Sequence, residues 1–236
     1  MAVENATVER KENMLVNIVF NIAIPALILA KLSTPERLGP VTALIAAICF
    51  PLSYGLYDLI KSGKWNFFSI LGLLSTLLTG GFALMKLPIF WFAVKEASIP
   101  TLFGLATLIS LKTRYPIVKK VLLNPALINI ELINQRLAED RLENDFEKIL
   151  VKSTYLLTAS FIVSAILNFS LAIYLLKSSP GTPAFNEELG KMFAWSYPVI
   201  VIPSMLVVMG SLWYLVSNLK KLTNMDLAEI LHAQKE

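Results

Sequence analysis

The chain carries little charge, one histidine and one cysteine. Only 16% of its 236 residues are charged, whereas a soluble domain usually has about 25%. The lone Cys49 excludes an internal disulfide and a cysteine-based metal site, and the lone His232 excludes a multi-histidine metal site. No phosphate-binding glycine loop is present either, because Gly80-Gly81 is an isolated pair. These absences predict no metal, no cofactor and no familiar type of catalytic centre.

The net charge of +4 is modest, and basic and aromatic residues do not interleave along the chain. A nucleic-acid surface needs clustered basic residues, so no nucleic-acid partner is expected.

Hydrophobic residues make up 56% of the chain and gather into six long segments, with the charges in short clusters between them. About 20 apolar residues in a helix cross the hydrocarbon core of a bilayer. We therefore predict an all-α integral membrane protein in a single membrane domain, and the first segment is an uncleaved helix because no small-x-small cleavage site follows it. The predicted spans are residues 14–31, 38–58, 65–85, 90–111, 153–176 and 192–219.

The fourth span is the weak point of this count. Its uncharged part, residues 97–111, is too short to cross a bilayer, so it must either include residues 90–96 or re-enter on the same side. We prefer the first reading, in which Lys95 and Glu96 lie in the interface. Lys95 then snorkels outward beside the aromatic residues 90–92.

The distribution of Lys and Arg predicts the orientation. With six spans, 15 of the 21 lie on the side of the two termini and six on the other side. The positive-inside rule therefore places both termini in the cytoplasm.

Residues 112–152 form the longest polar segment and are predicted to be a helical cytoplasmic loop. The loop begins with Lys112, Arg114, Lys119 and Lys120, which suit anionic lipid headgroups. Residues 129–152 are net acidic and are a candidate surface for a protein partner. Their apolar stripe changes face near Asp140, so either two short helices meet there or one helix packs on different partners.

Two polar clusters are candidate sites. On the cytoplasmic side, Asn17, Tyr54, Asp58 and Arg114 should lie in one layer, with Tyr54 and Asp58 one turn apart. An ionisable residue at membrane depth suggests function, but Asp58 could also be a structural partner of Lys61 or Arg114.

Lys95 and Glu96 form the second cluster, on the outer side. Polar groups at both ends of a bundle are typical of a permeation path with two gates. The structural alternative is an interfacial boundary, with Glu96 favoured by the helix dipole near the start of the fourth helix.

Small residues predict close helix packing. Gly72, Thr76 and Gly80 recur every four residues in the third span, and Pro100 and Gly104 are assigned to packing in the fourth. Sequences around Pro25 and Pro100 are also similar, so the chain could consist of two three-helix halves related as an inverted repeat. The sequence does not determine the oligomeric state.

The middle of the chain resembles a known family. It contains Asn66-Phe67-Phe68-Ser69, then Phe92-Ala93-Val94-Lys95-Glu96-Ala97-Ser98-Ile99-Pro100, Gly104-Leu105-Ala106 and Pro116-Ile117-Val118-Lys119-Lys120-Val121-Leu122. Residues 66–123 are thereby similar to the intracellular septation protein A group of bacterial inner-membrane proteins. The long charged loop and the hydrophilic start depart from that group, as in a diverged relative. The resemblance implies a bacterial inner-membrane location and a role in cell-envelope upkeep, with no catalytic residue to carry over.

Two functional hypotheses follow. In the first, the protein has no enzymatic activity and acts through partners or lipids. In the second, it is a small secondary transporter or channel with polar gates at Asp58 and at Lys95 and Glu96. An enzyme acting on a lipid headgroup through Asp58 is a third and weaker reading.

Overall fold

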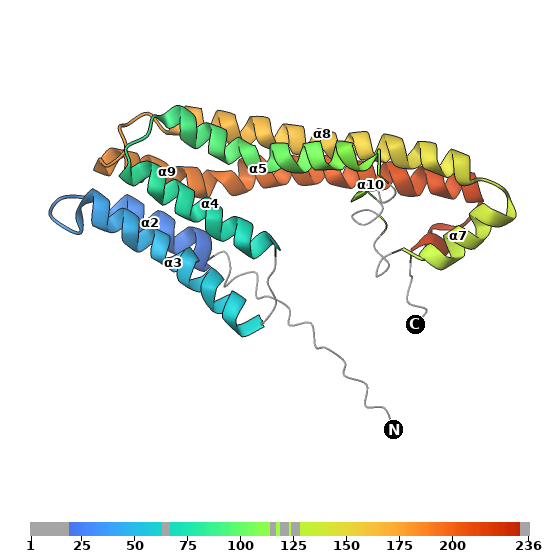
Figure 1. Cartoon of the computed structure of the whole chain (residues 1–236), viewed down its shortest axis with the longest axis horizontal. Coiled ribbons are helices and arrows are strands. Elements are labelled where there is room, and N and C mark those ends of the chain that lie inside the picture. Colours follow the sequence, from blue (N-terminus) through green and yellow to red (C-terminus); the bar gives the residue numbers. More distant parts are fainter. Residues whose placement is uncertain (1–18, 63–66, 114–116, 119–122, 124–127, 232–236) are drawn as a thin grey trace, which may run out of the picture. The chain divides into compact units, whose positions relative to one another are not determined.

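The computed structural model describes residues 19–62, 67–113, 117–118, 123 and 128–231, and nearly all of these are helical (Figure 1). Within these ranges the side chains of residues 21, 58, 59, 61, 62 and 67–69 are not described. The one pairing of strand type in this part of the chain is a single bridge between Ile128 and Leu231. The helices are η1 (Val19–Ala23), α2 (Ile24–Leu32), α3 (Gly39–Ser62), α4 (Phe67–Leu84), α5 (Ile89–Ser110), α7 (Ile130–Glu139), α8 (Glu143–Leu175), α9 (Pro183–Ser196), η2 (Tyr197–Val201), α10 (Ile202–Thr223) and α11 (Leu227–Ile230).

Four helical stretches are long and apolar enough to cross a membrane: Gly39–Tyr57, Ile89–Ser110, Glu143–Leu175 and Pro183–Thr223. They cover nearly all of the second, fourth and fifth predicted spans and contain the sixth. The apolar helix Ile70–Leu84 in the third predicted span is shorter, and the first span is described only from Val19 onward. The all-helical, membrane-like class of the fold is therefore confirmed.

The fourth span is one continuous helix. Because α5 begins at Ile89, it includes the aromatic residues and the Lys95-Glu96 pair, and its 22 residues measure about 33 Å. A helix of that length and composition can cross a bilayer without a break.

The described chain divides into two compact units. Unit 1 comprises Met1–Phe92 and Ile173–Trp195, and unit 2 comprises Ala93–Ala172 and Ser196–Glu236. Neither unit is one half of the sequence, so the two three-helix halves remain a prediction.

Unit 1 packs α9 against α2 through a glycine. A Cβ added to Gly190 would lie 2.9 Å from the carbonyl oxygen of Ala26 and 3.4 Å from the Cβ of Leu29, so only glycine allows this approach. Aromatic contacts link further elements of the unit, because the ring of Phe92 meets those of Phe82 and Phe185 edge-on, at 5.7 and 5.4 Å between centroids.

Unit 2 contains most of α5 and α8 and all of α10. The hydroxyl of Ser211 in α10 donates to the carbonyl oxygen of Ser153 in α8, at 3.0 Å. On another face of α8, the ring of Phe161 stacks on Phe103 of α5, and a Cβ added to Gly104 would lie 3.3 Å from that of Phe161.

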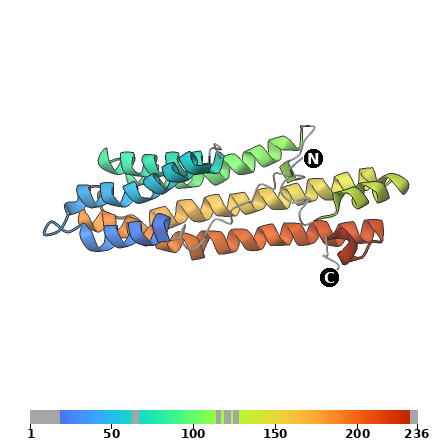
Figure 2. The same ribbon diagram turned by 90° about the horizontal axis from the view of Figure 1, so that it is seen from below.

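One end of α8 and one end of α10 join α7 and α11 in a small folded cap, visible in Figure 2 as the red end of α10 and its neighbours. The backbone N–H of Asn129 donates to the carbonyl oxygen of Ile230, at 2.9 Å. Buried apolar residues from all four helices and the intervening chain form its core. They are Val118, Leu123, Ile128, Ile133, Leu137, Phe146, Leu150, Leu157, Leu215, Val216, Leu219, Met225 and Ile230.

Of the two alternatives near Asp140, two helices or one, the structure has two helices. α7 ends at Glu139, Arg141 has a positive φ of 57°, and the Leu142 N–H donates to the carbonyl oxygen of Leu137. The second helix is not short, however, because α8 continues from Glu143 to Leu175. No proline or glycine interrupts the sequence between these residues, so the charged segment and the fifth span form one helix.

Candidate functional site

The most unusual polar feature of the apolar helices is the Lys95-Glu96 pair in α5. These are the seventh and eighth residues of the helix, so they lie about 10 Å along its axis from Ile89. The helix is apolar before them, with Phe90 and Trp91 half-exposed and Phe92 buried. A charged pair inside a helix that is long and apolar enough to cross a membrane meets the criterion for a functional candidate.

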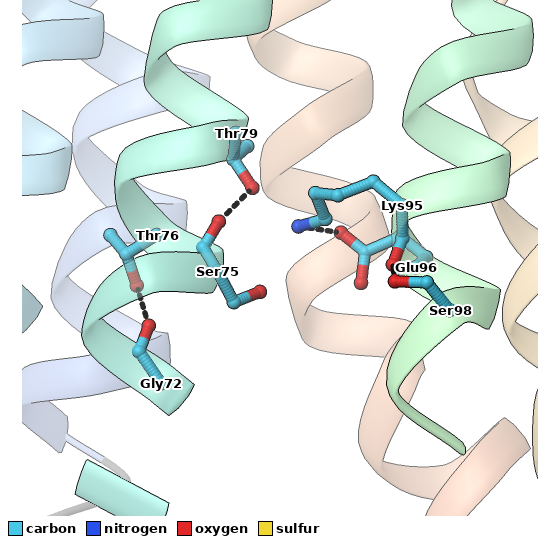
Figure 3. A network of polar contacts seen from close by, with 7 residues as sticks. All are labelled: Gly72, Ser75, Thr76, Thr79, Lys95, Glu96 and Ser98. Carbon is cyan, nitrogen blue, oxygen red and sulfur yellow. Dashed lines mark hydrogen bonds and ion pairs between the residues drawn. The ribbon is translucent and has the colours of Figure 1, made fainter. Parts of the chain in front are cut away.

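The two side chains form an ion pair. Lys95 Nζ lies 2.7 Å from Glu96 Oε1, and the side chains are 6% and 22% exposed (Figure 3). Neighbouring residues of a helix point about 100° apart and do not normally meet. The flexible stem of Lys95 therefore has to bend toward Glu96, and the pairing offsets the high cost of a buried charge.

The helical hydrogen-bonding pattern beside the pair is also altered. Pro100 has no N–H, so it removes the helical hydrogen bond to the carbonyl of Glu96. Hydroxyl groups bond to the neighbouring carbonyls, from Ser98 Oγ to Lys95 O and from Thr101 Oγ1 to Ala97 O, each at 2.7 Å. The charged pair is thus followed by a turn rich in polar backbone contacts.

The expectation that Lys95 snorkels outward is wrong. Its side chain is buried and turned to Glu96 instead of extending away from the helix. The carboxylate of Glu96, in direct contact at 2.7 Å, replaces the water that the ammonium group would otherwise need. Lys95 therefore does not have to reach the interface.

The predicted cytoplasmic cluster lies largely outside the described residues. Asn17 and Arg114 are not among them, and of Asp58 only the backbone, within α3, is described. Tyr54 is described, and its ring stacks on Phe20 of η1 with centroids 5.9 Å apart and planes 22° apart. Tyr54 therefore contacts an aromatic ring, and the polar cluster itself stays a prediction.

The predicted packing residues differ in their surroundings. A Cβ on Gly80 would clash with the Cδ1 of Ile48 in α3 at 2.5 Å, whereas one on Gly72 would meet no atom within 4 Å. The Thr76 hydroxyl donates to the carbonyl of Gly72 in its own helix, at 2.9 Å (Figure 3). Among the described residues of this series, close packing against another helix is found at Gly80.

Sequence reasoning missed Asn186 of α9, which is fully buried. Its Nδ2 donates to the hydroxyl of Ser33 at 3.0 Å and to the carbonyl of Pro40 at 2.7 Å, so it joins α9 to both sides of the α2–α3 turn. Its Oδ1 has no hydrogen-bond partner among the described residues. The signal in the sequence was an asparagine next to the polar segment of residues 187–191.

Glu188 of α9 was also missed. Its carboxylate accepts hydrogen bonds from the backbone N–H groups of Lys177 and Ser178, at 2.8 and 2.9 Å, and from the Ser178 hydroxyl at 2.7 Å. This carboxylate fixes the turn between α8 and α9, which is a structural role.

Unit 2 also contains buried hydroxyl groups that the sequence reasoning did not single out. Ser153 and Thr158 of α8 are 0% and 3% exposed, and their hydroxyl groups have no hydrogen-bond partner in the described part of the chain. Small hydroxyl side chains are common where membrane helices pack closely.

The predicted lipid site at the start of the polar loop is described at one residue. Lys112 is exposed, while Arg114, Lys119 and Lys120 lie outside the described residues. Residues 129–152, the predicted partner surface, belong to the cap and to the start of α8.

Among the described residues, no three His, Cys, Asp or Glu side chains gather where they could hold a metal ion. The Lys95-Glu96 pair has no net charge, and each of its two charged groups is of a kind that binds an ionic solute or water when the pair separates.

Comparison of the chain with models of protein families, with curated proteins and with solved structures finds no match.

Proposed function

We propose that the chain is a multi-span protein of the bacterial inner membrane that binds a cytoplasmic partner through its cap, in the upkeep of the cell envelope. The observation that carries the proposal is the cap. The bacterial location and the physiological role rest on the resemblance of residues 66–123 to the septation protein A group.

The apolar residues of the cap are used internally. Ile133 and Leu137 of α7 and Phe146 and Leu150 of α8 are all buried in the same cluster as Leu219. A segment that served only as a linker would have no need of such a core. The cap is therefore a folded platform at one end of unit 2.

The outer surface of the platform is charged. Every acidic and basic residue between positions 131 and 148 is exposed, and six acids stand against three bases. Two of the bases are paired within their own helices, Arg136 with Glu139 at 3.9 Å and Lys148 with Asp145 at 2.7 Å. A net acidic surface attracts a partner with a basic surface and repels anionic lipid.

Site-specific photo-crosslinking in cells tests the partner. A crosslinker at exposed Ala138 should capture a protein, whereas one at Leu206, 65% exposed on α10, should capture lipid. The protein adduct at position 138 should disappear when Glu139, Asp140 and Glu143 are changed together to Lys. It should persist in the control Glu139→Asp, Asp140→Glu and Glu143→Asp, which keeps all three charges. An adduct that is insensitive to these charges would contradict the proposal.

The proposed topology has six crossings with both termini in the cytoplasm. It is supported by the shared end of unit 2, where the start of α8 shares its buried core with the last turns of α10, which carry Lys220 and Lys221. In a Cys49→Ser background, single cysteines at the exposed residues Thr34 and Ser179 should react in whole cells with a membrane-impermeant maleimide. Cysteines at the exposed residues Gln135 and Ala228 should not, and the reverse pattern would exclude this orientation.

The alternative, a small secondary transporter or channel, is favoured by the buried ion pair of α5. In that reading Asp58 and the Lys95-Glu96 pair are polar gates. Lys95→Ala or Asp58→Asn should then abolish solute or proton flux in liposomes while the protein still folds, with Lys191→Ala, at an exposed pair, as control. Equal flux in all these variants would rule out the transporter.

A further inference from the structure

A groove of about 570 Å³ opens on the surface of unit 1, between η1 and α3. Its volume lies in the range of sites that hold small molecules. The residues that line it are Phe20, Cys49, Phe50, Ser53, Tyr54 and Tyr57.

Irregular helix geometry shapes the groove. On one side η1 is a π-helical turn, a local widening that is frequent at functional positions. On the other side Pro51 interrupts the hydrogen bonding of α3 and excludes a bond to the carbonyl of Ala47. The stacked rings of Phe20 and Tyr54 join the two sides, so the groove is built by backbone and packed rings.

The chemistry of the lining is apolar. Four aromatic rings and one thiol contribute, the only hydroxyl groups are those of Ser53, Tyr54 and Tyr57, and none of the lining side chains is charged. Such a surface offers no charged side chain that would compensate the desolvation of an inorganic ion or a charged solute. It suits a hydrocarbon chain, which gains from contact with aromatic faces.

The groove is continuous with the outer apolar surface of α3. Phe50 and Tyr57 both line the groove and are exposed, by 36% and 57%. On the same helix Ile45 and Leu56 are exposed by about half, as side chains that face lipid would be. Because α3 is long and apolar enough to cross a membrane, acyl chains are the neighbours of this surface in a bilayer.

We infer that this groove holds one acyl chain of a membrane phospholipid. Tyr54 and Tyr57 lie toward the end of the Gly39–Tyr57 span, and tyrosine is favoured at that level because its hydroxyl group reaches the headgroups. The lipid headgroup accordingly lies at the Tyr57 end and the chain extends toward Cys49. This inference is independent of the proposed partner.

The single cysteine of the chain gives a direct test, because Cys49 lines the groove and is exposed. The full-length protein is labelled at Cys49 with a fluorophore and kept in detergent micelles, to which increasing fractions of a phospholipid brominated on its acyl chains are added. The matched control is Cys49→Ser with Ile166→Cys, a position 58% exposed on α8. The Cys49 label should reach half-maximal quenching at a brominated fraction about threefold lower than the control, because aromatic contacts retain the chain.

A second comparison uses Ser53. Ser53→Trp fills the groove and should bring the quenching curve of the Cys49 label to that of the control, whereas Ser53→Ala should leave it unchanged. Quenching of Cys49 by aqueous iodide but not by brominated lipid would overturn the inference. So would the absence of both kinds of quenching, which would mean that residues 1–18 or a second copy of the chain cover the groove, and so would identical curves for Cys49 and the control.

Discussion

At the residue scale, the Lys95-Glu96 pair shows how a charge is accommodated in an apolar helix. Two adjacent side chains meet at 2.7 Å because one of them is long and flexible, and the pair replaces the water that each charge loses. Removing one partner therefore destabilises the protein much more than removing both, because the remaining charge stays buried without its counter-charge.

We predict that Lys95→Ala lowers the free energy of unfolding by about 2–4 kcal/mol, since Glu96 is then left partly buried without its cation. The double variant Lys95→Met with Glu96→Gln should recover most of this loss. Thermal unfolding in detergent measures both. The control is Lys191→Ala, which breaks a pair exposed by 56% and 53% and should cost under about 1 kcal/mol. Equal stability of Lys95→Ala and the double variant would show that the ion pair does not compensate the burial of these two charges.

At the scale of helices, the glycines differ in what surrounds them. Gly190 lets α9 approach the backbone of α2, whereas Gly210 of α10 has open space where a Cβ would be. The two residues are therefore a matched pair of helix glycines that differ in the space around them.

Gly190→Ala should destabilise the protein by about 1–3 kcal/mol, because a Cβ 2.9 Å from a backbone oxygen forces α9 away from α2. Gly210→Ala should be neutral or slightly stabilising, because alanine is the better helix former. Thermal unfolding of the two variants side by side checks this. Similar losses in both would mean that the helix contact at Gly190 is not close in the folded protein.

At the scale of the whole chain, the cap connects segments far apart in sequence. Ile230 is fully buried among residues of α7, α8 and α10, and its carbonyl accepts the N–H of Asn129. The segment after α10 therefore closes the core that α7 needs.

A chain that ends at Thr223 should expose α7. Trypsin should then cut at Arg136 and Arg141 faster by about tenfold or more, since the cap loses the buried side chains of Met225 and Ile230. The full-length variant Leu227→Ala is the control, because Leu227 is 44% exposed. Unchanged cleavage of the shortened chain would show that the segment after α10 does not hold α7 in place.

Much of the element pattern could be predicted from the sequence, because a bilayer requires long apolar runs and charges between them. Helices of sufficient length cover nearly all of the runs at residues 38–58, 90–111, 153–176 and 192–219, and the apolar stripe indicated a change of packing near Asp140, where a helix break lies. Local patterns do not report where a helix ends beyond the membrane, so the extension of α8 back to Glu143 was missed.

The sequence by itself determined the class of the fold, since helix period and apolar length depend on residues that are close along the chain. Only the tertiary structure decided that Lys95 is buried against Glu96, that Asn186 bonds to Ser33 and Pro40, and that Phe20 and Tyr54 border a groove beside Cys49. These features depend on side-chain direction and on contacts between distant segments. The scarcity of charge, histidine and cysteine thus excluded many kinds of site, while the sites that remain were set by packing.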